Sequence, residues 1–551
     1  AAVEEEGEEE EESQKEDPGD QEKEKHRPQK EDPREEEEER HRPKYSYATP
    51  CIEEGVCSVF EITIRALGGL VSAHSLSGDE VFLQRAKEIA DELMPAFTAQ
   101  NKNAFPDKFV DLRGGQSINH WDHVETRQIA EVASLQLEFR YLSHHLNISK
   151  YKRIVDTIMN YVLDAAGGLG IVPDVIYGVG EPHFPMQYVT TGEGRVTFGA
   201  GVDSYYEYLL KQYLQTSKVE TRFIRPWARA MKEVRRPPKR GGGGLLMHNE
   251  GFSLIIEREE NGDPKERMEH LTCALAGNLM LGSRQIPRTE IDGVELRQLE
   301  NLAERITETC YEMYRGSRTG LAPEAILIRK GRIEADPEGL YNLLRPETVE
   351  ALYYMHYFTG NPKYREWGYR IFQAFKKYCK TEYGYASVAD VRQDDADQKH
   401  TGEDRQESFW MAETLKYLYL LFSPPSLLDL DEYVFNTEGH PLKIWNGSAT
   451  LADGTLGLAF AQSPFAGFWF YFKVIFTSPQ LLIGGLVSSF LITTIVCACI
   501  DDDRPRKDHD SDTEDPQRQC RGQREEVDRH VRRIGRESLE EFEDEPMLQE
   551  E

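Results

Sequence analysis

Acidic residues occupy the starts of several strongly apolar segments, where a hydrophobic core would otherwise be expected. Glu61 lies in SVFEITIRALGGL, Asp203 in FGAGVDSYYEYLL and Glu347 in LLRPETVEALY. Three further acids have similar apolar and aromatic neighbours, namely Glu350, Glu413 and Glu438. Burying so many unpaired carboxylates would be costly. We therefore expect these side chains to line one shared polar cavity.

Each acid also has a simpler explanation when it is taken alone. Asp203 could cap a helix, and Glu347 follows Pro346 in a first helical turn, where the helix dipole favours negative charge. Glu61 and Arg65 are four residues apart and could form a surface ion pair. Because charged residues are usually solvated, the simpler explanation is favoured for each acid taken alone. The recurrence of the pattern favours a cavity.

Sugar hydrolysis is the leading chemistry for a pocket rich in acids, aromatic rings and arginines. One carboxylic acid protonates the leaving oxygen, and a second carboxylate acts from the opposite face of the sugar. A hard cation with oxygen ligands is also compatible with crowded carboxylates. A zinc site and a Ser-His-Asp hydrolase are not supported, because His and Cys lack metal spacing and Gly-x-Ser-x-Gly is absent.

The main body of the chain shows a repeated helical hairpin. The stretches HSLSGDEVFLQRAKEI, SHHLNISKYKRIVDTI and HYFTGNPKYREWGYRI each join an apolar helix end, a polar turn and a new amphipathic helix. We predict helices over 79–96, starting at Asp79, and over 361–380, starting at Asn361. Such hairpins stack either into an open solenoid or into a closed ring around a central cavity. Strand signals are few, and GGGG at 241–244 is predicted to be a flexible surface insertion.

Composition and charge divide the 551 residues into five parts. We expect a disordered acidic tract over residues 1–50 and the helical domain over 51–446. A linker with an aromatic interfacial segment follows over 447–480. A transmembrane helix over 481–500 and a disordered cytosolic tail over 501–551 complete the chain. Arg504, Arg506 and Lys507 follow the apolar stretch, so the positive-inside rule places the domain in a lumen. The net charge of −31 argues against a nucleic-acid partner.

A lumenal location bears on two kinds of covalent modification. The chain has eight cysteines, which are too few for a disulfide scaffold of this length but permit one or two bridges. Asn147-Ile-Ser and Asn446-Gly-Ser are acceptor patterns for N-linked glycans. Such triplets are common by chance, so only the lumenal placement gives them weight.

Five motifs together resemble glycoside hydrolase family 47, the class I α-1,2-mannosidases that trim N-glycans in the endoplasmic reticulum and Golgi. The motifs are FEITIRALGGLVSAHSLSGD, DSYYEYLLKQYL, LLRPETVEALYY, ESFWMAETLKYLYLLF and VFNTEGHPL, and the likeness runs in order from about Ser58 to Trp445. The resemblance implies an all-α fold, an (αα)7 barrel. It also implies inverting hydrolysis that uses Ca²⁺, with high-mannose N-glycans on glycoproteins as substrates. The location would be the membrane of the endoplasmic reticulum or Golgi, with the domain in the lumen.

The resemblance also implies roles for individual residues. Glu61 matches the general acid, Glu347 the base that activates water, and Asp203 a third carboxylate. Thr437 matches the residue that ligates Ca²⁺ with its hydroxyl and carbonyl oxygens. Cys273 and Cys310 match the disulfide of the family. Residues that match sugar-binding or cavity positions are Arg65, Glu131, His270, Arg345, Glu350, Phe409, Glu413 and Glu438.

The chain departs from the family pattern before the Phe60-Glu61 motif. Relatives usually carry an extra helical stretch there, and this chain has the acidic tract and KYSYATPCIEEGVC instead. We therefore expect a barrel that lacks its first helical segment. A ring left open by that loss would lose activity, so the alternative is a mannose-binding module of glycoprotein quality control. A helical scaffold without a ligand is a third reading, and the buried acids count against it.

Overall fold

The computed structural model describes most of the central part of the chain. The described residues are 51–53, 55–97, 105–118, 126–177, 194–249, 251–330, 332–393 and 406–445. All of them belong to one of two compact units, Ala1–Pro464. In this part of the chain, no helix is long and apolar enough to cross a membrane. The predicted acidic tract, linker, transmembrane helix and cytosolic tail lie outside the described residues.

A set of inner helices is buried on almost every side. In α8, for example, every residue after Asp203 except Glu207 is buried. A helix that is buried all round belongs to the interior of a fold. Each inner helix packs against the next one along the chain. The inner helices are α3 (Gly68–Ser77), α6 (Gln136–Leu146), α8 (Asp203–Gln215), α10 (Ala274–Gln285), α12 (Glu347–Thr359) and α14 (Leu415–Phe422).

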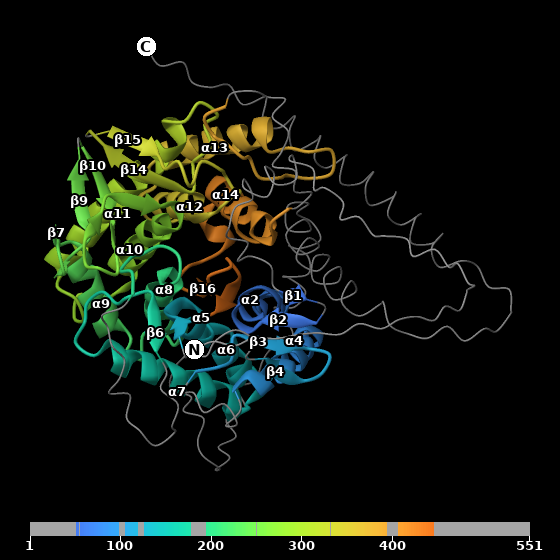
Figure 1. The fold of residues 1–551 in the computed structure, drawn as a ribbon. Helices are drawn as coiled ribbons and strands as arrows, with labels where there is room; N and C mark the ends of the chain where they lie inside the picture. The colour runs from blue at the N-terminus through green and yellow to red at the C-terminus, as the bar shows by residue number, and fades with distance from the viewer. Residues whose placement is uncertain are drawn as a thin grey trace, which may run out of the picture. The chain divides into compact units, whose positions relative to one another are not determined.

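Amphipathic outer helices cover this inner set (Figure 1). Each packs on the inner helix that precedes it, so the repeated helical hairpin and the all-α barrel are confirmed. In α13 the buried face includes Tyr364, Ile371 and Phe375, at helical spacing. The outer helices are α4 (Glu80–Leu93), α7 (Ser149–Ala166), α9 (Ile224–Val234), α11 (Gly293–Arg315) and α13 (Lys363–Tyr378).

The predicted helix starts are confirmed in atomic detail. The Asp79 carboxylate accepts a hydrogen bond from the N–H of Val81 at 3.0 Å at the start of α4. The Asn361 side chain accepts one from the N–H of Lys363 at 3.0 Å at the start of α13. Both helices end before the predicted limits of residues 96 and 380. The number of seven helix pairs stays a prediction, because the described residues supply six inner and five outer helices.

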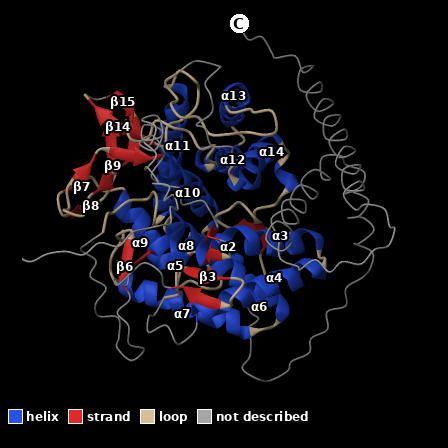
Figure 2. Cartoon of the chain, turned by 45° about the vertical axis from the view of Figure 1, so that its right-hand side comes forward, coloured by secondary structure: helices blue, strands red, loops and turns tan. Residues whose placement is uncertain are grey.

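Short antiparallel strands occupy many of the connections between helices (Figure 2), although the sequence shows few strand signals. Their bounds are β1 (Cys51–Glu53), β2 (Val56–Ser58), β3 (Phe109–Asp111), β4 (Gln116–Ile118), β5 (Thr126–Gln128), β6 (Val175–Tyr177), β7 (Pro238–Lys239), β8 (Gly242–Gly243), β9 (Leu246–Asn249), β10 (Phe252–Ile255), β11 (Glu257–Arg258), β12 (Pro264–Lys265), β13 (Arg267–Glu269), β14 (Ala325–Arg329), β15 (Arg332–Ala335), β16 (Tyr433–Phe435) and β17 (Pro441–Lys443). Strands β1 to β4 form one sheet and β13 to β15 another, and the rest pair in twos. The sequence hid them because they are too short to show an alternating pattern.

The glycine run 241–244 is part of this strand structure and not a flexible insertion. Gly242 and Gly243 form β8, which pairs with β7. A Cβ atom on Gly244 would lie 2.2 Å from the carbonyl oxygen of Arg236, two residues after the end of α9. The run is therefore explained by tight packing and hairpin geometry, which a side chain would obstruct.

Hairpin β16–β17 enters the ring from the C-terminal ends of the inner helices. At its base, the N–H of Lys443 donates to Ser75 Oγ of α3 at 2.8 Å, and the N–H of Trp445 donates to the Gln215 carbonyl of α8 at 3.1 Å. At its tip, Asn436 Nδ2 donates to the Ile64 carbonyl at 2.9 Å, near the other end of the same helical stretch. The hairpin thus carries residues 436–439 into the middle of the ring.

Candidate active site

The candidate residues converge because the inner helices run in the same direction. Asp203 and Glu347 are the first residues of α8 and α12. Five others stand in the short turns that lead into inner helices, namely Glu61 in α2 (Val59–Ile62), Arg65 in η1 (Thr63–Leu67), Glu131 in α5 (Ile129–Ala133), His270 in η3 (His270–Cys273) and Glu413 in η4 (Trp410–Thr414). Helix N-termini favour negative charge. One end of the ring therefore collects positive dipole ends, and carboxylates gather there.

Two π-helical turns carry candidate residues within this end of the ring. They are η1, which contains Arg65, and η4, which contains Glu413. Such turns are rare and are frequent at functional sites, because the extra residue re-aims neighbouring side chains. No sequence pattern predicted them.

Arg65 joins the first inner helix to the last one. Its Nε donates to Glu61 Oε2 at 2.8 Å, so the predicted pair on one helix face is present. Its Nη1 donates to Ser408 Oγ at 2.7 Å, just before η4, and also pairs with the Glu438 carboxylate. Glu61 and Glu438 are buried. The pair is therefore interior and not a solvated surface ion pair.

Glu347 is held by a histidine from a distant segment. His270 Nδ1 lies 2.8 Å from Glu347 Oε2, and His270 Nε2 lies 3.0 Å from both Tyr314 Oη and Thr348 Oγ1. Burial alone would raise the pKa of the Glu347 carboxyl. The hydrogen bond and charge of His270, with the charge of Arg345, hold that pKa below its usual value. Glu347 is therefore the carboxylate that stays ionised at neutral pH, as a general base must.

A strained turn places Arg345 ahead of Glu347. Leu344 is fully buried and has a φ of 65°, which a leucine rarely adopts. Its N–H donates to Asn342 Oδ1 at 3.0 Å, and its carbonyl accepts from Thr414 Oγ1 at 2.6 Å. These bonds fix the turn, and such strain is typical of functional sites.

Phe409 lies between the two arginines of the site. Its ring centroid is 5.9 Å from the guanidinium carbon of Arg65 and 5.7 Å from that of Arg345. Arg345 Nε also donates to Glu324 Oε2 at 2.6 Å. A buried aromatic ring flanked by two donor groups suits a sugar, which offers an apolar face and a rim of hydroxyls.

Asp203 differs from Glu347 in its protonation. Burial raises the pKa of Asp203 to about 7, and the nearby charges of Glu207 and Glu347 act in the same direction. A hydrogen bond from the N–H of Ser204, at 3.0 Å, offsets only part of this effect. Val202, not Asp203, is the capping residue of α8. The pKa of Asp203 is thus raised above its ordinary value and that of Glu347 is lowered below its own. Sites that contain both an acid and a base show such opposite shifts.

Three more acids belong to this cluster: Glu438 in the hairpin tip, Glu413 in η4 and Glu350 in α12. Burial, with the charges of Glu438, Glu347 and Glu350, raises the pKa of Glu413 well above its usual value. Burial raises the pKa of Glu350 to about 8, and Tyr417 Oη lies 3.2 Å from its Oε1. Burial likewise raises the pKa of Glu438. Burial is the main cause of these shifts, and the mutual repulsion of neighbouring carboxylates adds to it.

The surroundings of Thr437 fit a hard cation that is held partly through water. Among the described residues, no three His, Cys, Asp or Glu side chains converge to hold a metal ion directly. Glu138 Oε2 is buried without a hydrogen-bond partner, while the other oxygen of that carboxylate accepts from Asn436, next to Thr437. Crowded carboxylates and hydroxyl oxygens are the donors that Ca²⁺ prefers.

Comparison with known proteins identifies the family. Residues 41–444 match the description "Glycosyl hydrolase family 47". This chain belongs to glycosyl hydrolase family 47.

Individual relatives agree with this family assignment. The chain is 40% identical over 401 residues to the human endoplasmic reticulum mannosyl-oligosaccharide 1,2-alpha-mannosidase, covering 70% of this chain and 53% of that protein. It is 36% identical to the mannosyl-oligosaccharide 1,2-alpha-mannosidase of Candida albicans, covering 70% and 69%. It thus spans about half the length of the human relative. The structure of an alpha-1,2-mannosidase from Trichoderma reesei superposes with a TM-score of 0.60 at 23% identity, covering 73% of this chain and 85% of that one, which shows the shared fold.

Glu138 is a site residue of this family 47 chain that the sequence reasoning missed. Its Oε1 accepts hydrogen bonds from Tyr208 Oη and Asn436 Nδ2, each at 2.7 Å. Burial raises its pKa to about 7. Tyr208 Oη in turn accepts from the N–H of Thr437 at 3.4 Å. A single acid within the apolar run LQLEFRYL was the available signal.

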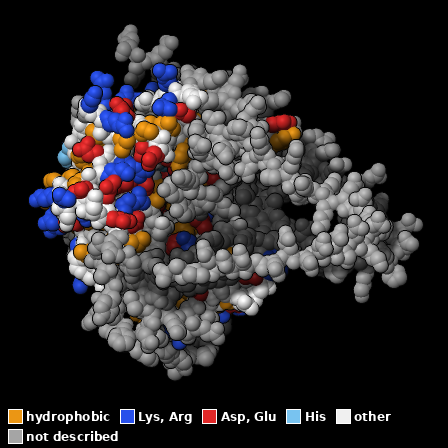
Figure 3. Space-filling view, in the orientation of Figure 1, with side chains coloured by type: hydrophobic (Ala, Val, Ile, Leu, Met, Phe, Trp, Pro, Cys, Tyr) orange, Lys and Arg blue, Asp and Glu red, His pale blue; other side chains and the backbone are white. Residues whose placement is uncertain are grey.

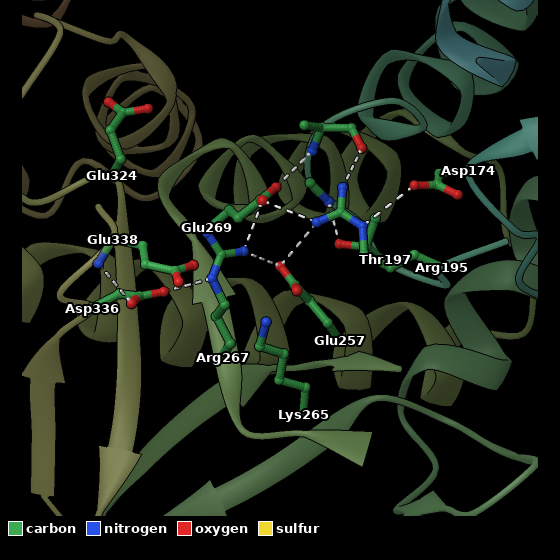
Figure 4. A network of polar contacts seen from close by, with 12 residues as sticks. Asp174, Arg195, Thr197, Glu257, Lys265, Arg267, Glu269, Glu324, Asp336 and Glu338 are labelled. Carbon is green, nitrogen blue, oxygen red and sulfur yellow. Dashed lines mark hydrogen bonds and ion pairs between the residues drawn. The ribbon is translucent and has the colours of Figure 1, made fainter. Parts of the chain in front are cut away.

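A second set of missed residues ties the Asp203 loop to the His270 side of the site (Figure 4). Glu269 Oε2 accepts from the N–H of Ala200 at 2.9 Å, and Glu269 Oε1 lies 3.0 Å from Arg195 Nη1. Arg267, Glu257 and Asp336 extend this network of ion pairs. A Cβ on Gly199 would lie 2.2 Å from Glu269 Oε2, so the loop approaches closely only because it has glycine there.

Glu131 is linked to the site less directly than expected. It stands in α5, whose Ala130 N–H donates to the Gly201 carbonyl at 2.9 Å, beside the start of α8. Its carboxylate pairs with Lys108 Nζ at 2.9 Å. Its sugar-binding role stays a prediction.

Two disulfides are present in the described part of the chain. Cys273 and Cys310, the pair that the family resemblance implied, join the start of α10 to α11. Cys51 and Cys57 form a second bridge across β1 and β2, which the sequence reasoning did not anticipate. Disulfides persist in oxidising compartments such as a lumen.

The outer surface has a different character from the acid cluster. A groove of about 880 Å³ lies between α9 and α11, and none of the candidate residues lines it. Its charged lining includes Lys232, Arg235, Arg305, Glu304 and Glu308. Acidic and basic side chains are interspersed on this face (Figure 3), as on an ordinary solvated surface. The candidate residues therefore lie apart from this groove.

Proposed function

We propose that this chain hydrolyses terminal α-1,2-linked mannose from high-mannose N-glycans, with inversion at the anomeric carbon. The observation that carries the proposal is the pair of carboxyl groups with opposite pKa shifts, half-buried Asp203 and buried Glu347, at the N-termini of α8 and α12 in one ring of inner helices. The substrate class comes from the relatives, which are mannosyl-oligosaccharide 1,2-alpha-mannosidases.

Each carboxyl group has a place in this mechanism. Glu347, kept ionised by His270 and Arg345, takes a proton from the attacking water. Glu61 is the proposed general acid toward the leaving oxygen. Asp203 is a further carboxyl group of the site, and its pKa is raised to about 7. Inverting hydrolysis needs room for a water between sugar and base, on the face opposite the acid.

The sugar would be held by the groups around these carboxyls. Phe409 offers a ring to the apolar face of mannose, and Arg65 and Arg345 offer donors to its hydroxyls. Thr437, Glu438, Glu413 and Glu350 would hold Ca²⁺ directly or through water. When bound, the ion orients sugar hydroxyls and the attacking water and neutralises the acid cluster.

We place the reaction in the lumen of the endoplasmic reticulum or Golgi. The support is the name of the human relative, the two disulfides, and the apolar stretch 481–500 with the basic residues that follow it. Anchoring to the membrane through that stretch is part of the proposal.

The test is incubation of the purified chain with an α-1,2-linked mannose oligosaccharide, with and without a chelator. We expect chelator-sensitive release of mannose, and a loss of about 10²–10⁴-fold in kcat for Glu347→Gln. The anomer released first, read by NMR, reports inversion. Binding of the oligosaccharide without release would instead identify the mannose-binding module.

A further inference from the structure

The turn between α6 and α7 carries a feature that the proposed reaction does not use. Asn147, Ile148 and Ser149 form one of two acceptor triplets for N-linked glycans in the sequence. The other begins at Asn446, which lies outside the described residues. The triplet alone is a weak signal, so its setting in the fold decides what it means.

The side chain of Asn147 is exposed and has no structural task. It ends α6 with φ 56° and ψ 38°, a left-handed conformation that asparagine tolerates well. Its backbone N–H donates to the Ser143 carbonyl. Among the described residues, its side-chain amide has no hydrogen-bond partner, and attachment of a large group there would break no described contact.

The turn is fixed from beneath, by a residue other than Asn147. Ser143 Oγ donates to the Ile148 carbonyl at 2.6 Å and accepts from the N–H of Lys152 at 2.8 Å. Ser143 is fully buried. These bonds hold the backbone in place while Asn147 remains accessible, so the acceptor stands on an ordered frame at the surface.

The turn lies at the end of the ring opposite the catalytic carboxyl groups. These groups stand at the N-termini of the inner helices, and Asn147 follows the C-terminus of α6. An 11-residue helix is about 16 Å long. Trp445, at the base of hairpin β16–β17, stacks on His144 with ring centroids 4.5 Å apart, which marks this as the end where the hairpin enters.

We propose that Asn147 carries an N-linked glycan. The donor class is an oligosaccharide linked to a lipid diphosphate. A bond forms between Asn147 Nδ2 and the anomeric carbon of the first sugar, the bond from that carbon to the diphosphate oxygen breaks, and the amide loses one proton. The proposal rests on the lumenal placement proposed above. It adds that the chain's own glycan stands clear of its own cavity, so modification leaves turnover unchanged.

The test uses the full chain, translated behind a secretory signal in the presence of microsomes. Only the protease-protected fraction is scored, which ensures that the molecules measured have reached the lumen. We expect Ser149→Ala to remove one glycan increment on a gel and Ser149→Thr to retain it. Ser149→Ala is preferable to a change of Asn147, because it leaves the left-handed residue in place. In Asn446→Gln the other triplet cannot carry a glycan, so any increment in gel mass that this variant loses is assigned to Asn446.

Mass spectrometry of the protected chain then gives the deciding result. Enzymatic release of the glycan should leave aspartate at position 147. Protected chain with unmodified Asn147 would overturn the proposal, and a fall in kcat/KM in folded Ser149→Ala would overturn the placement away from the cavity. A glycosylated chain that releases no mannose would refute the proposed function and leave this site standing. A chain that releases mannose but has unmodified Asn147 would refute the glycan site and leave the proposed function standing.

Discussion

The hydrogen bond between His270 and Glu347 should set the acidic limit of activity. His270 Nδ1 and Glu347 Oε2 are 2.8 Å apart in a buried setting, and the two residues are 77 positions apart in the chain. Removing the imidazole in His270→Ala leaves Glu347 buried without its main stabilising partner. Because burial disfavours the charged carboxylate, its pKa should rise.

The size of the effect follows from the geometry. A hydrogen bond to a charged group contributes about 1.5–3 kcal/mol, and about 1.4 kcal/mol corresponds to one pKa unit. The pKa of Glu347 should therefore rise by about 1–2 units in His270→Ala. Since the base must be ionised, the acidic limb of the kcat/KM profile should move to higher pH by the same amount.

The assay is kcat/KM for mannose release across the pH range in which the protein stays folded. Tyr314→Phe is the matched control, since it removes the hydroxyl 3.0 Å from His270 Nε2 and leaves the bond to Glu347. It should produce a smaller shift in the same direction. Circular dichroism establishes that both variants are folded. An unmoved acidic limb in folded His270→Ala would refute the assignment of Glu347 as the base that His270 holds ionised.

Four further outcomes follow from the same structure. Asp203→Asn should shift or abolish the alkaline limb of the pH profile, because the carboxyl with a pKa of about 7 is the one that loses its proton there; an unchanged limb would contradict a part for the Asp203 proton in turnover. Glu138→Ala should lower the melting temperature and weaken the stabilisation by Ca²⁺. The change removes two buried hydrogen bonds of 2.7 Å, from Tyr208 and from Asn436 in the hairpin tip. Calorimetry with and without Ca²⁺ measures both effects. Replacing Cys273 and Cys310 by serine opens a loop with a sequence separation of 37 residues and should cost about 4 kcal/mol in denaturant unfolding. With Ca²⁺ removed by a chelator, the stability of the fold should decrease as pH rises. The pKa of Asp203 is raised in the folded protein above its unfolded value of about 4, so ionisation of this carboxyl favours the unfolded chain. Equal melting temperatures at pH 5 and pH 7.5 would contradict this.

Part of this site was predictable because local sequence carries its signal. An acid within an apolar run marks a buried charge, and this pattern pointed to Glu61, Asp203 and Glu347. The spacing of Glu61 and Arg65 on one helix face fixed their contact in advance, and it is present at 2.8 Å. Capping residues such as Asp79 fixed helix starts for the same reason, since the cap and the N–H it accepts from are neighbours in sequence.

The remaining features depend on closure of the ring, which no local pattern encodes. Phe409 meets Arg65 across more than three hundred residues of chain, and His270 meets Glu347 across 77. Glu138 was missed because its partners, Tyr208 and Asn436, come from another hairpin and from the tip of β16–β17. The glycine run 241–244 was misinterpreted because it packs against the backbone around the end of α9. The composition of the run itself gives no sign of that contact.

Charge balance explains why this arrangement needs more than its own side chains. The buried acids of the site include Glu61, Glu138, Glu347, Glu350, Glu413 and Glu438. Arg65 faces Glu61 and Glu438 together, while Arg345 is shared with Glu324. Lys211 is buried beside Glu207, and half-buried Lys416 donates to the Gly439 carbonyl. The acids thus outnumber the cations. Burial is the main cause of the raised pKa values of Glu350, Glu413 and Glu438, and the charges of neighbouring carboxylates raise them further. Helix N-termini offset part of the excess, and the rest must be met by protons or by a divalent ion. A chain that exchanges those protons for Ca²⁺ should release protons as it binds the ion, and proton release on Ca²⁺ titration in weakly buffered solution measures that exchange.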